Sequence, residues 1–161
     1  MHAGKPGKTL NFKTFKERGE WVELRFMTAA VEHGFKVSKP WGDCRAYDVG
    51  VEHGPNFLRV QVKSTTVRTG TGSFCQFKPN ARKKQDYTLG QIDLFAAYII
   101  PVDAWYLIPA VLLLGLERKT AVMLYPVVPL RKNRYSYEAY KEAWPLLAKS
   151  KRALAVRPKP R

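Results

Sequence analysis

The sequence is poor in the residues that support several kinds of chemistry. It has only two cysteines, Cys44 and Cys75, with no Cys-x-x-Cys motif, and its three histidines are scattered at His2, His33 and His53. Such spacing supports neither a zinc site nor a serine or cysteine nucleophile activated by histidine. Two separate cysteines are typical of a reducing compartment, so we expect a cytoplasmic protein without disulfides.

Long apolar segments are also missing. The most apolar stretch, residues 92–116, is broken by two acids and two prolines: Asp93, Pro101, Asp103 and Pro109. Its longest run without a charge, 104–116, is shorter than the roughly 20 residues that a membrane-spanning helix needs. The first residues, MHAGKPGK, contain no apolar segment typical of a secretory signal. We therefore expect neither a membrane span nor a membrane partner.

Acidic residues are scarce, and this scarcity points to a partner. The chain has 13 Asp and Glu against 28 Lys and Arg, which gives a formal charge of +15. Charge of one sign repels itself in a small body unless a partner neutralises it. Nucleic acid is the commonest polyanion that binds such a surface, so the composition favours a nucleic-acid-binding protein.

The length of 161 residues fits one domain. Residues 1–8 and 152–161 are rich in Lys, Arg, Pro and Gly, and we predict that they form a flexible basic arm and a flexible basic tail. No linker or repeat interrupts the sequence between them. The domain is therefore predicted to span residues 9–151.

Helical spacing is clearest near the start of this domain. A helix is predicted from about Phe15 to His33, ended by Gly34. Its apolar stripe is predicted to contain four residues: Trp21, Leu24, Met27 and Val31.

Extended segments follow this helix. A second helix is predicted over SYEAYKEAWPLL (136–147), and Pro145 is expected to shorten or kink it. The extended segments are FKVSKPW, AYDVGVE, FLRVQVKSTT, IDLFAAYII, AWYLIPA and KTAVMLYPV. Helix, strands and helix in this order predict an α/β fold with a mixed β-sheet flanked by helices. Four aromatic residues are predicted to pack in the core rather than to stack on bases: Phe95, Tyr98, Trp105 and Tyr106.

The segments AYDVGVE and FLRVQVKSTT are predicted to form a hairpin around the turn HGPN. If the turn is symmetric, facing residues sum to 109, so Glu52 lies opposite Phe57 and Asp48 opposite Gln61. Lys63 shares the face of Gln61, because alternate residues of a strand point the same way. The hairpin thus brings Asp48, Gln61 and Lys63 within roughly 5–8 Å of one another.

An acid, an amide and an ammonium in this arrangement suit phosphodiester hydrolysis. Magnesium prefers oxygen ligands, so Asp48 is the expected main ligand and the Gln61 carbonyl a second. Lys63 would orient the attacking water and stabilise negative charge in the transition state. A further acid, Glu23 or alternatively Glu20, is expected to come from the first helix.

These residues resemble a known pattern. Gly19 and Glu23 in G-x-x-x-E, then YDV with Asp48, then QVK with Gln61 and Lys63, are similar to the PD-(D/E)XK nuclease superfamily. Over about residues 15–115 the chain most resembles the branch of homing endonucleases associated with group I introns, which carries Gln-x-Lys.

The resemblance implies a restriction-endonuclease-like core and cleavage of double-stranded DNA with Mg²⁺, or alternatively Mn²⁺, as cofactor. It also implies a homo-oligomer, either a dimer or a tetramer. Two positions depart from the pattern that names the superfamily. Tyr47 replaces the proline before the acid, and Gln61 replaces an acid, which removes one negative metal ligand and should weaken metal binding.

A basic segment follows the hairpin. Lys78, Arg82, Lys83 and Lys84 are expected to contact DNA phosphates. Such contacts set affinity and register without reading bases.

Three functions remain open on the sequence. The first is a DNA endonuclease, site-specific in the manner of a homing enzyme. The second is a non-catalytic DNA-binding protein with a nuclease fold, which Gln61 favours. The third is a structure-specific nuclease similar to a Holliday-junction resolvase. Metal-dependent nicking separates the first two, and a comparison of branched with linear DNA separates the third.

Overall fold

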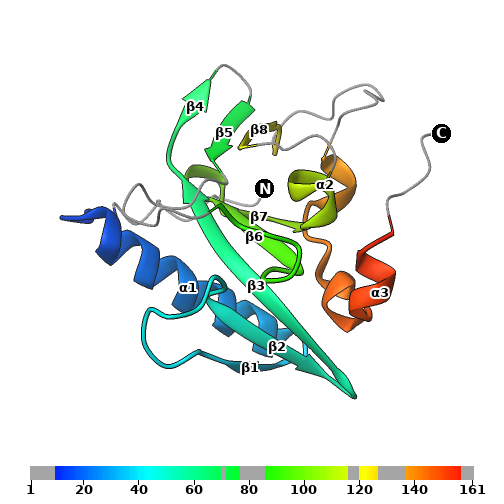
Figure 1. Cartoon of the computed structure of the whole chain (residues 1–161). Helices are drawn as coiled ribbons and strands as arrows, with labels where there is room; N and C mark the ends of the chain where they lie inside the picture. The colour runs from blue at the N-terminus through cyan, green and yellow to red at the C-terminus, as the bar shows by residue number, and fades with distance from the viewer. Residues whose placement is uncertain (1–9, 70–71, 77–85, 116–119, 127–136, 157–161) are drawn as a thin grey trace, which may run out of the picture.

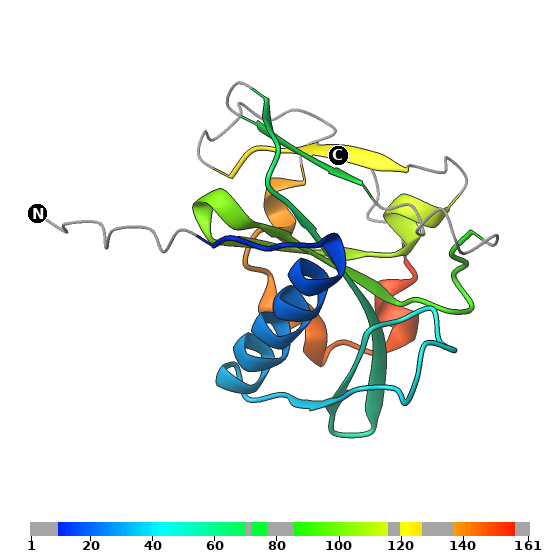
Figure 2. The ribbon, with the colours of Figure 1, turned by 90° about the vertical axis from the view of Figure 1, so that its left-hand side faces the viewer.

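The structure is a computed structural model, and it describes residues 10–69, 72–76, 86–115, 120–126 and 137–156. A central sheet lies between a long helix on one face and a small second sheet on the other (Figures 1 and 2). The long helix is α1 (Phe15–Glu32). No helix within the described residues has both the length and the hydropathy of a membrane span.

The central sheet is mixed, as the sequence predicts. Its order is β1-β2-β3-β6-β7, and only β3 and β6 are parallel. The strands are β1 (Lys36–Ser38), β2 (Val49–His53), β3 (Asn56–Thr65), β6 (Leu94–Ile99) and β7 (Ala104–Pro109).

The second sheet has the order β4-β5-β8. Its strands are β4 (Arg68–Thr69), β5 (Gly72–Gln76) and β8 (Ala121–Leu124). The short helix η1 (Ile100–Val102) joins β6 to β7, and α2 (Val111–Leu114) follows β7.

Helix α1 begins and ends as its sequence predicts. Thr14 caps its first turn by accepting a hydrogen bond of 3.1 Å from the backbone N–H of Glu17. Gly34, with φ +86°, directly follows the C-cap residue His33 and adopts the left-handed conformation common after helices.

The predicted apolar stripe of α1 is half right: Trp21 and Met27 are partly buried and pack against the core, but Leu24 and Val31 do not. The buried residues are Val22, Phe26 and Ala30, whereas Leu24 and Val31 are 59% and 54% exposed. Leu24 lies two residues from both Val22 and Phe26, which is about half a turn around the helix from each. The stripe at i, i+4, i+8 therefore faces the sheet, and Leu24 faces solvent.

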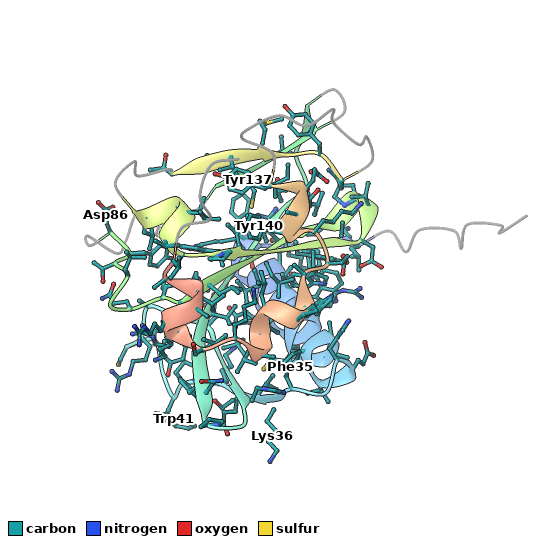
Figure 3. The ribbon with its side chains drawn as sticks, turned by 90° about the vertical axis from the view of Figure 1, so that its right-hand side faces the viewer. Phe35, Lys36, Trp41, Asp86, Tyr137 and Tyr140 are labelled. Carbon is teal, nitrogen blue, oxygen red and sulfur yellow. The ribbon has the colours of Figure 1, made fainter. Side chains whose placement is uncertain are left out.

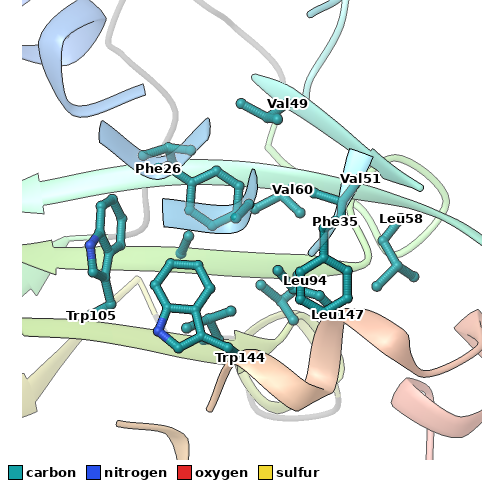
Figure 4. Packing of buried hydrophobic residues seen from close by; sticks show 14 of the residues in the cluster. Phe26, Phe35, Val49, Val51, Leu58, Val60, Leu94, Trp105, Trp144 and Leu147 are labelled. Carbon is teal, nitrogen blue, oxygen red and sulfur yellow. The ribbon is translucent and has the colours of Figure 1, made fainter. Parts of the chain in front are cut away.

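Hydrophobic clusters cover both faces of the central sheet. Against α1, Val60 of β3 packs with Phe26, Trp105 and Trp144 (Figure 4). On the opposite face, Phe95 and other residues of β6 and β7 pack with residues of β5 and β8. The four aromatic residues predicted to lie in the core are 4% exposed or less, which confirms that prediction.

The predicted helix over 136–147 is wrong. Residues 137–156 contain η2 (Glu138–Tyr140), η3 (Trp144–Ala148) and α3 (Lys151–Leu154) instead. Glu142, between η2 and η3, has φ +49°, and its carboxylate accepts hydrogen bonds from Trp105 N–H and Trp144 Nε1–H at 2.7 and 2.8 Å. These contacts fix the segment against β7 and interrupt the helix. The expected start of the basic tail, residue 152, lies within α3, and Leu154 there is 4% exposed.

A bidentate ion pair joins Arg59 of β3 to Asp93, the residue that directly precedes β6. Arg59 donates to Asp93 through Nε at 2.9 Å and Nη2 at 2.8 Å, and its backbone N–H donates at 2.8 Å. Burial alone would raise the pKa of Asp93, but the hydrogen bonds and charge of Arg59 lower it below its ordinary value of 3.8. The pair therefore stabilises the fold when Asp93 is ionised.

We expect Asp93→Asn to lower the free energy of unfolding by about 1.5–3 kcal/mol at neutral pH. Because the folded pKa of Asp93 lies below the unfolded one, this contribution is fully present above about pH 4 and is lost as the pH falls through the folded value. Urea unfolding of both proteins at neutral and acid pH measures it, with the exposed Glu32→Gln as control. An equal difference at every pH would contradict this account.

Candidate active site

The register of β2 and β3 confirms the predicted hairpin. Glu52 pairs with Phe57 and Val49 with Val60. Asp48 directly precedes β2, and its N–H donates to the Val60 carbonyl at 2.9 Å. Asp48 lies outside this paired stretch, and its backbone bonds to Val60, the partner of Val49.

The side chains of Asp48 and Gln61 are in direct contact. Gln61 Nε2 donates to Asp48 Oδ2 at 2.5 Å. The same oxygen accepts from the backbone N–H of Val62 at 2.8 Å. The pairing of β2 with β3 ends at Val60. The Val62 N–H, which lies beyond that end, donates to the Asp48 carboxylate instead of to a carbonyl of β2. Gln61 is 6% exposed, so its amide is a buried polar group held by this acid.

Lys63 lies two residues farther along the same face of β3. Its ammonium donates to the Tyr87 hydroxyl at 2.9 Å and lies 5.2 Å from the centre of the Tyr87 ring. Tyr87 is 6% exposed, and its ring packs edge-on against Phe95. Burial, and then the negative charge of Asp48, raise the pKa of Tyr87, so the phenol is neutral at ordinary pH. Lys63 is thus held by a rigid neutral partner.

Cys75 of β5 also belongs to this environment. Burial raises the pKa of its thiol to about 12, while the positive charge of Lys63 acts in the opposite direction. The thiol is therefore protonated at neutral pH and is not a nucleophile.

The helix acid Glu23 meets a lysine that the sequence did not single out. Lys39 Nζ lies 2.5 Å from Glu23 Oε2. Its hydrogen bond to Glu23 raises the pKa of Lys39 against the opposing effect of burial, and the charges of Glu23, Asp48 and Glu20 raise it further. Lys39 therefore interacts electrostatically with both Glu23 of the helix and Asp48. The Glu20 side chain is 59% exposed and lies 3.9 Å from Lys16, so Glu23 is the less exposed of the two helix acids.

The donor atoms suit a hard divalent cation. Asp48 and Glu23 offer carboxylate oxygens, and Gln61 offers an amide oxygen, as Mg²⁺ prefers. Within the described residues, no group of three or more His, Cys, Asp or Glu could hold a metal ion, so a site here has at most two acids. The Lys39 ammonium on Glu23 shows that this position already attracts a cation.

The expected phosphate contacts, Lys78, Arg82, Lys83 and Lys84, lie outside the described residues, as do residues 1–9 and 157–161 of the expected arms. Two residues of the site were missed by sequence reasoning, Tyr87 and Lys39. Neither stands in a recognisable motif, and both reach the site from other parts of the chain.

The mixed five-stranded sheet with helices against it is a restriction-endonuclease-like α/β fold. A family model described as PD-(D/E)XK endonuclease matches residues 13–144, and the chain belongs to this family. The resemblance drawn from the hairpin motifs is thereby confirmed. Members of the family generally use divalent metal ions.

A solved structure supports this fold. The bacterial homing endonuclease I-Ssp6803I matches with a TM-score of 0.71 and 20% identity, over 84% of this chain and 93% of that chain. Hjc, a Holliday junction resolvase from the archaeal hyperthermophile Archaeoglobus fulgidus, matches with a TM-score of 0.47 and 17% identity, over 68% and 88%. No curated protein matches the sequence.

Proposed function

We propose that this chain is a DNA endonuclease that hydrolyses phosphodiester bonds with a divalent metal ion, Mg²⁺ or alternatively Mn²⁺. The observation that carries the proposal is the contact of Asp48 with Gln61 at the end of the hairpin, with Lys63 on the same face. Membership of the endonuclease family supports it.

In this proposal Asp48 and Glu23 hold the metal, and the Gln61 carbonyl is a further oxygen ligand. When bound there, a divalent metal would lower the pKa of a coordinated water and neutralise charge on the phosphate. Lys63 orients the attacking water and stabilises the negative charge of the transition state. Tyr87 keeps the Lys63 ammonium in place through the hydrogen bond of 2.9 Å.

The substrate we propose is double-stranded DNA cut at a specific site, as by a homing enzyme. One domain of this size reaches few base pairs, so a dimer or tetramer is the proposed form that reads a long site. The net charge of +15 supports DNA as the partner. Sedimentation of the active protein tests the assembly, and a fully active monomer would contradict it.

Incubation of linear, supercoiled and branched DNA with Mg²⁺, Mn²⁺ or EDTA tests the activity. We expect cuts at discrete positions in linear or supercoiled DNA, only when metal is present. Binding without cleavage of every substrate would favour a non-catalytic DNA-binding protein, a function that Gln61 and the Lys39–Glu23 ion pair also fit. Cleavage of branched DNA alone would favour a resolvase-like nuclease.

An acid at position 61 is expected to strengthen metal binding and to lower the stability of the metal-free protein. Gln61→Glu replaces the donor to Asp48 with a second carboxylate, so the free energy of unfolding without metal falls by about 1–3 kcal/mol. The added charge raises metal affinity by about tenfold. Thermal unfolding with and without Mg²⁺ measures both effects, with the exposed Gln91→Glu as control. A metal-free variant as stable as the parent would contradict the contact.

Lys39 is expected to compete with the metal for Glu23. Lys39→Met removes the ammonium, so metal affinity rises by about 5–10-fold, a modest gain because the Lys39 side chain is half exposed. Calorimetric titration of Mg²⁺ or Mn²⁺ into the DNA-free protein measures it, and Lys36→Met on β1 is the matched control. Weaker binding in Lys39→Met would show instead that Lys39 positions Glu23 for the metal.

A further inference from the structure

The segment between β1 and β2 is attached to the candidate site at both ends. Lys39, at its start, is paired with Glu23, and Asp48 is at its end. Between them, Trp41 is 98% exposed and lies at the lower edge of the molecule in the view of Figure 3. An aromatic side chain is therefore displayed to solvent within a few residues of the proposed metal ligands.

This exposure is unusual for the tryptophans of the chain. Trp105 and Trp144 are 4% exposed. Trp21 is partly buried, with ring centres of Phe12 and Tyr98 at 5.2 and 6.0 Å. A fully exposed indole leaves a large, rigid apolar surface available to a partner.

The backbone around Trp41 is restricted. Proline at position 40 fixes its own φ, and Gly42, with φ +68°, adopts a left-handed conformation that other residues rarely take. The backbone conformation on both sides of Trp41 is therefore restricted.

The net charge of the chain favours a polyanion as the partner of Trp41. The exposed charges nearest to Trp41 in the sequence are mixed: Lys36 pairs in register with the exposed Glu52, Lys39 is bound to Glu23, and Arg45 lies close in sequence to Asp43. The chain as a whole carries a formal charge of +15, and DNA offers both phosphates and apolar sugar and base surfaces.

We propose that Trp41 contacts duplex DNA beside the cleaved bond, with its indole against deoxyribose and base edges in the groove. This inference rests on the proposed function. If Asp48 holds the phosphate that is cleaved, the DNA lies beside the segment that carries Trp41 and ends at Asp48. Apolar side chains inserted into a groove in this way also favour DNA distortion. Trp41 is thus a binding residue for DNA, separate from the groups that act on the phosphate.

Acrylamide quenching of tryptophan fluorescence tests the contact. The difference between wild type and Trp41→Phe isolates the Trp41 signal, since the other three tryptophans are packed to various degrees. An unlabelled mixed-sequence duplex in EDTA, where no metal permits cleavage, is expected to protect Trp41 from acrylamide. Unchanged quenching in the saturated complex would overturn the proposal.

Fluorescence anisotropy with a labelled duplex supplies the second measurement. Trp41→Ala is expected to weaken binding about 5–100-fold, as for other aromatic contacts to bases, and Trp41→Phe by less. Val31→Ala, at an exposed apolar residue near the end of α1, is expected to bind as wild type does. Equal affinity of Trp41→Ala and wild type, or a change in sedimenting mass instead of DNA affinity, would overturn the proposal.

The results also separate this inference from the proposed function. Protection of Trp41 by DNA, with no cleavage in Mg²⁺ or Mn²⁺, would leave the contact standing and contradict the nuclease activity. Metal-dependent cleavage with Trp41 still accessible to acrylamide would support the nuclease activity and contradict the Trp41 contact. Absence of any duplex binding would contradict both.

Discussion

Replacing Lys63 by methionine is expected to lower the rate of DNA cleavage about 10²–10³-fold, because the variant lacks the ammonium that stabilises charge in the transition state. Methionine keeps most of the apolar stem, so the packing of Tyr87 on Phe95 remains. The variant is expected to cleave DNA more slowly even when the protein saturates the DNA, whereas its affinity for DNA changes little. Initial rates of plasmid nicking, measured with anisotropy on the same proteins, separate the two.

Lys149→Met is the matched control for Lys63→Met. Lys149 is exposed and follows η3. It is expected to nick DNA as wild type does. Equal losses in both variants would mean that general positive charge, and not the ammonium at Lys63, supports cleavage.

Asp48→Asn is expected to abolish metal-dependent cleavage and to weaken metal binding. The loss of groups that merely orient metal ligands costs about 10–100-fold in affinity, so removal of the main charged ligand costs at least as much. The carbonyl oxygen of asparagine can take the place of Asp48 Oδ2 and accept from both Val62 N–H and Gln61 Nε2, so the fold is expected to persist. Calorimetric titration of Mn²⁺ and circular dichroism measure the two effects.

Asp43→Asn provides the control in the same connection between β1 and β2. Asp43 is exposed, and its loss changes the net charge by the same amount as the loss of Asp48. Unchanged metal affinity in both variants would remove Asp48 from the metal site, whereas a loss in both would indicate a nonspecific effect of charge.

The hairpin could be predicted from the sequence because local rules determine it. A short turn between two β-rich segments fixes the register, and the alternation of a strand assigns each side chain to a face. Those two rules bring Asp48 next to Gln61 and place Lys63 on the same face, and the structure has this geometry. The catalytic roles of these residues remain predictions.

The errors arose where tertiary contacts override local pattern. Apolar residues lie around much of α1, and only packing against the sheet decides that Phe26 is buried and Leu24 is not. The predicted helix over 136–147 fails because the Glu142 carboxylate binds β7 and the side chain of Trp144. No periodicity in the sequence reports such contacts.

The partners within the site were also beyond local reasoning. Tyr87 meets Lys63 across 24 positions of sequence, and Lys39 meets Glu23 across 16. A lone tyrosine or lysine outside a motif has no distinguishing signal in one sequence. These contacts follow from the arrangement of β3, α1 and the segments that lead into β2 and β6.

The most direct test of the central claim is nicking of supercoiled plasmid by the wild-type protein and by Lys63→Met, each with Mg²⁺ and with EDTA. We predict nicked and linear products from the wild type with Mg²⁺ alone, and almost none from the variant although it still binds the plasmid. Cleavage by wild type and variant at equal rates would show that the active site is not on the hairpin. A wild type that binds plasmid and leaves it intact with Mg²⁺ and Mn²⁺ would contradict the nuclease function itself.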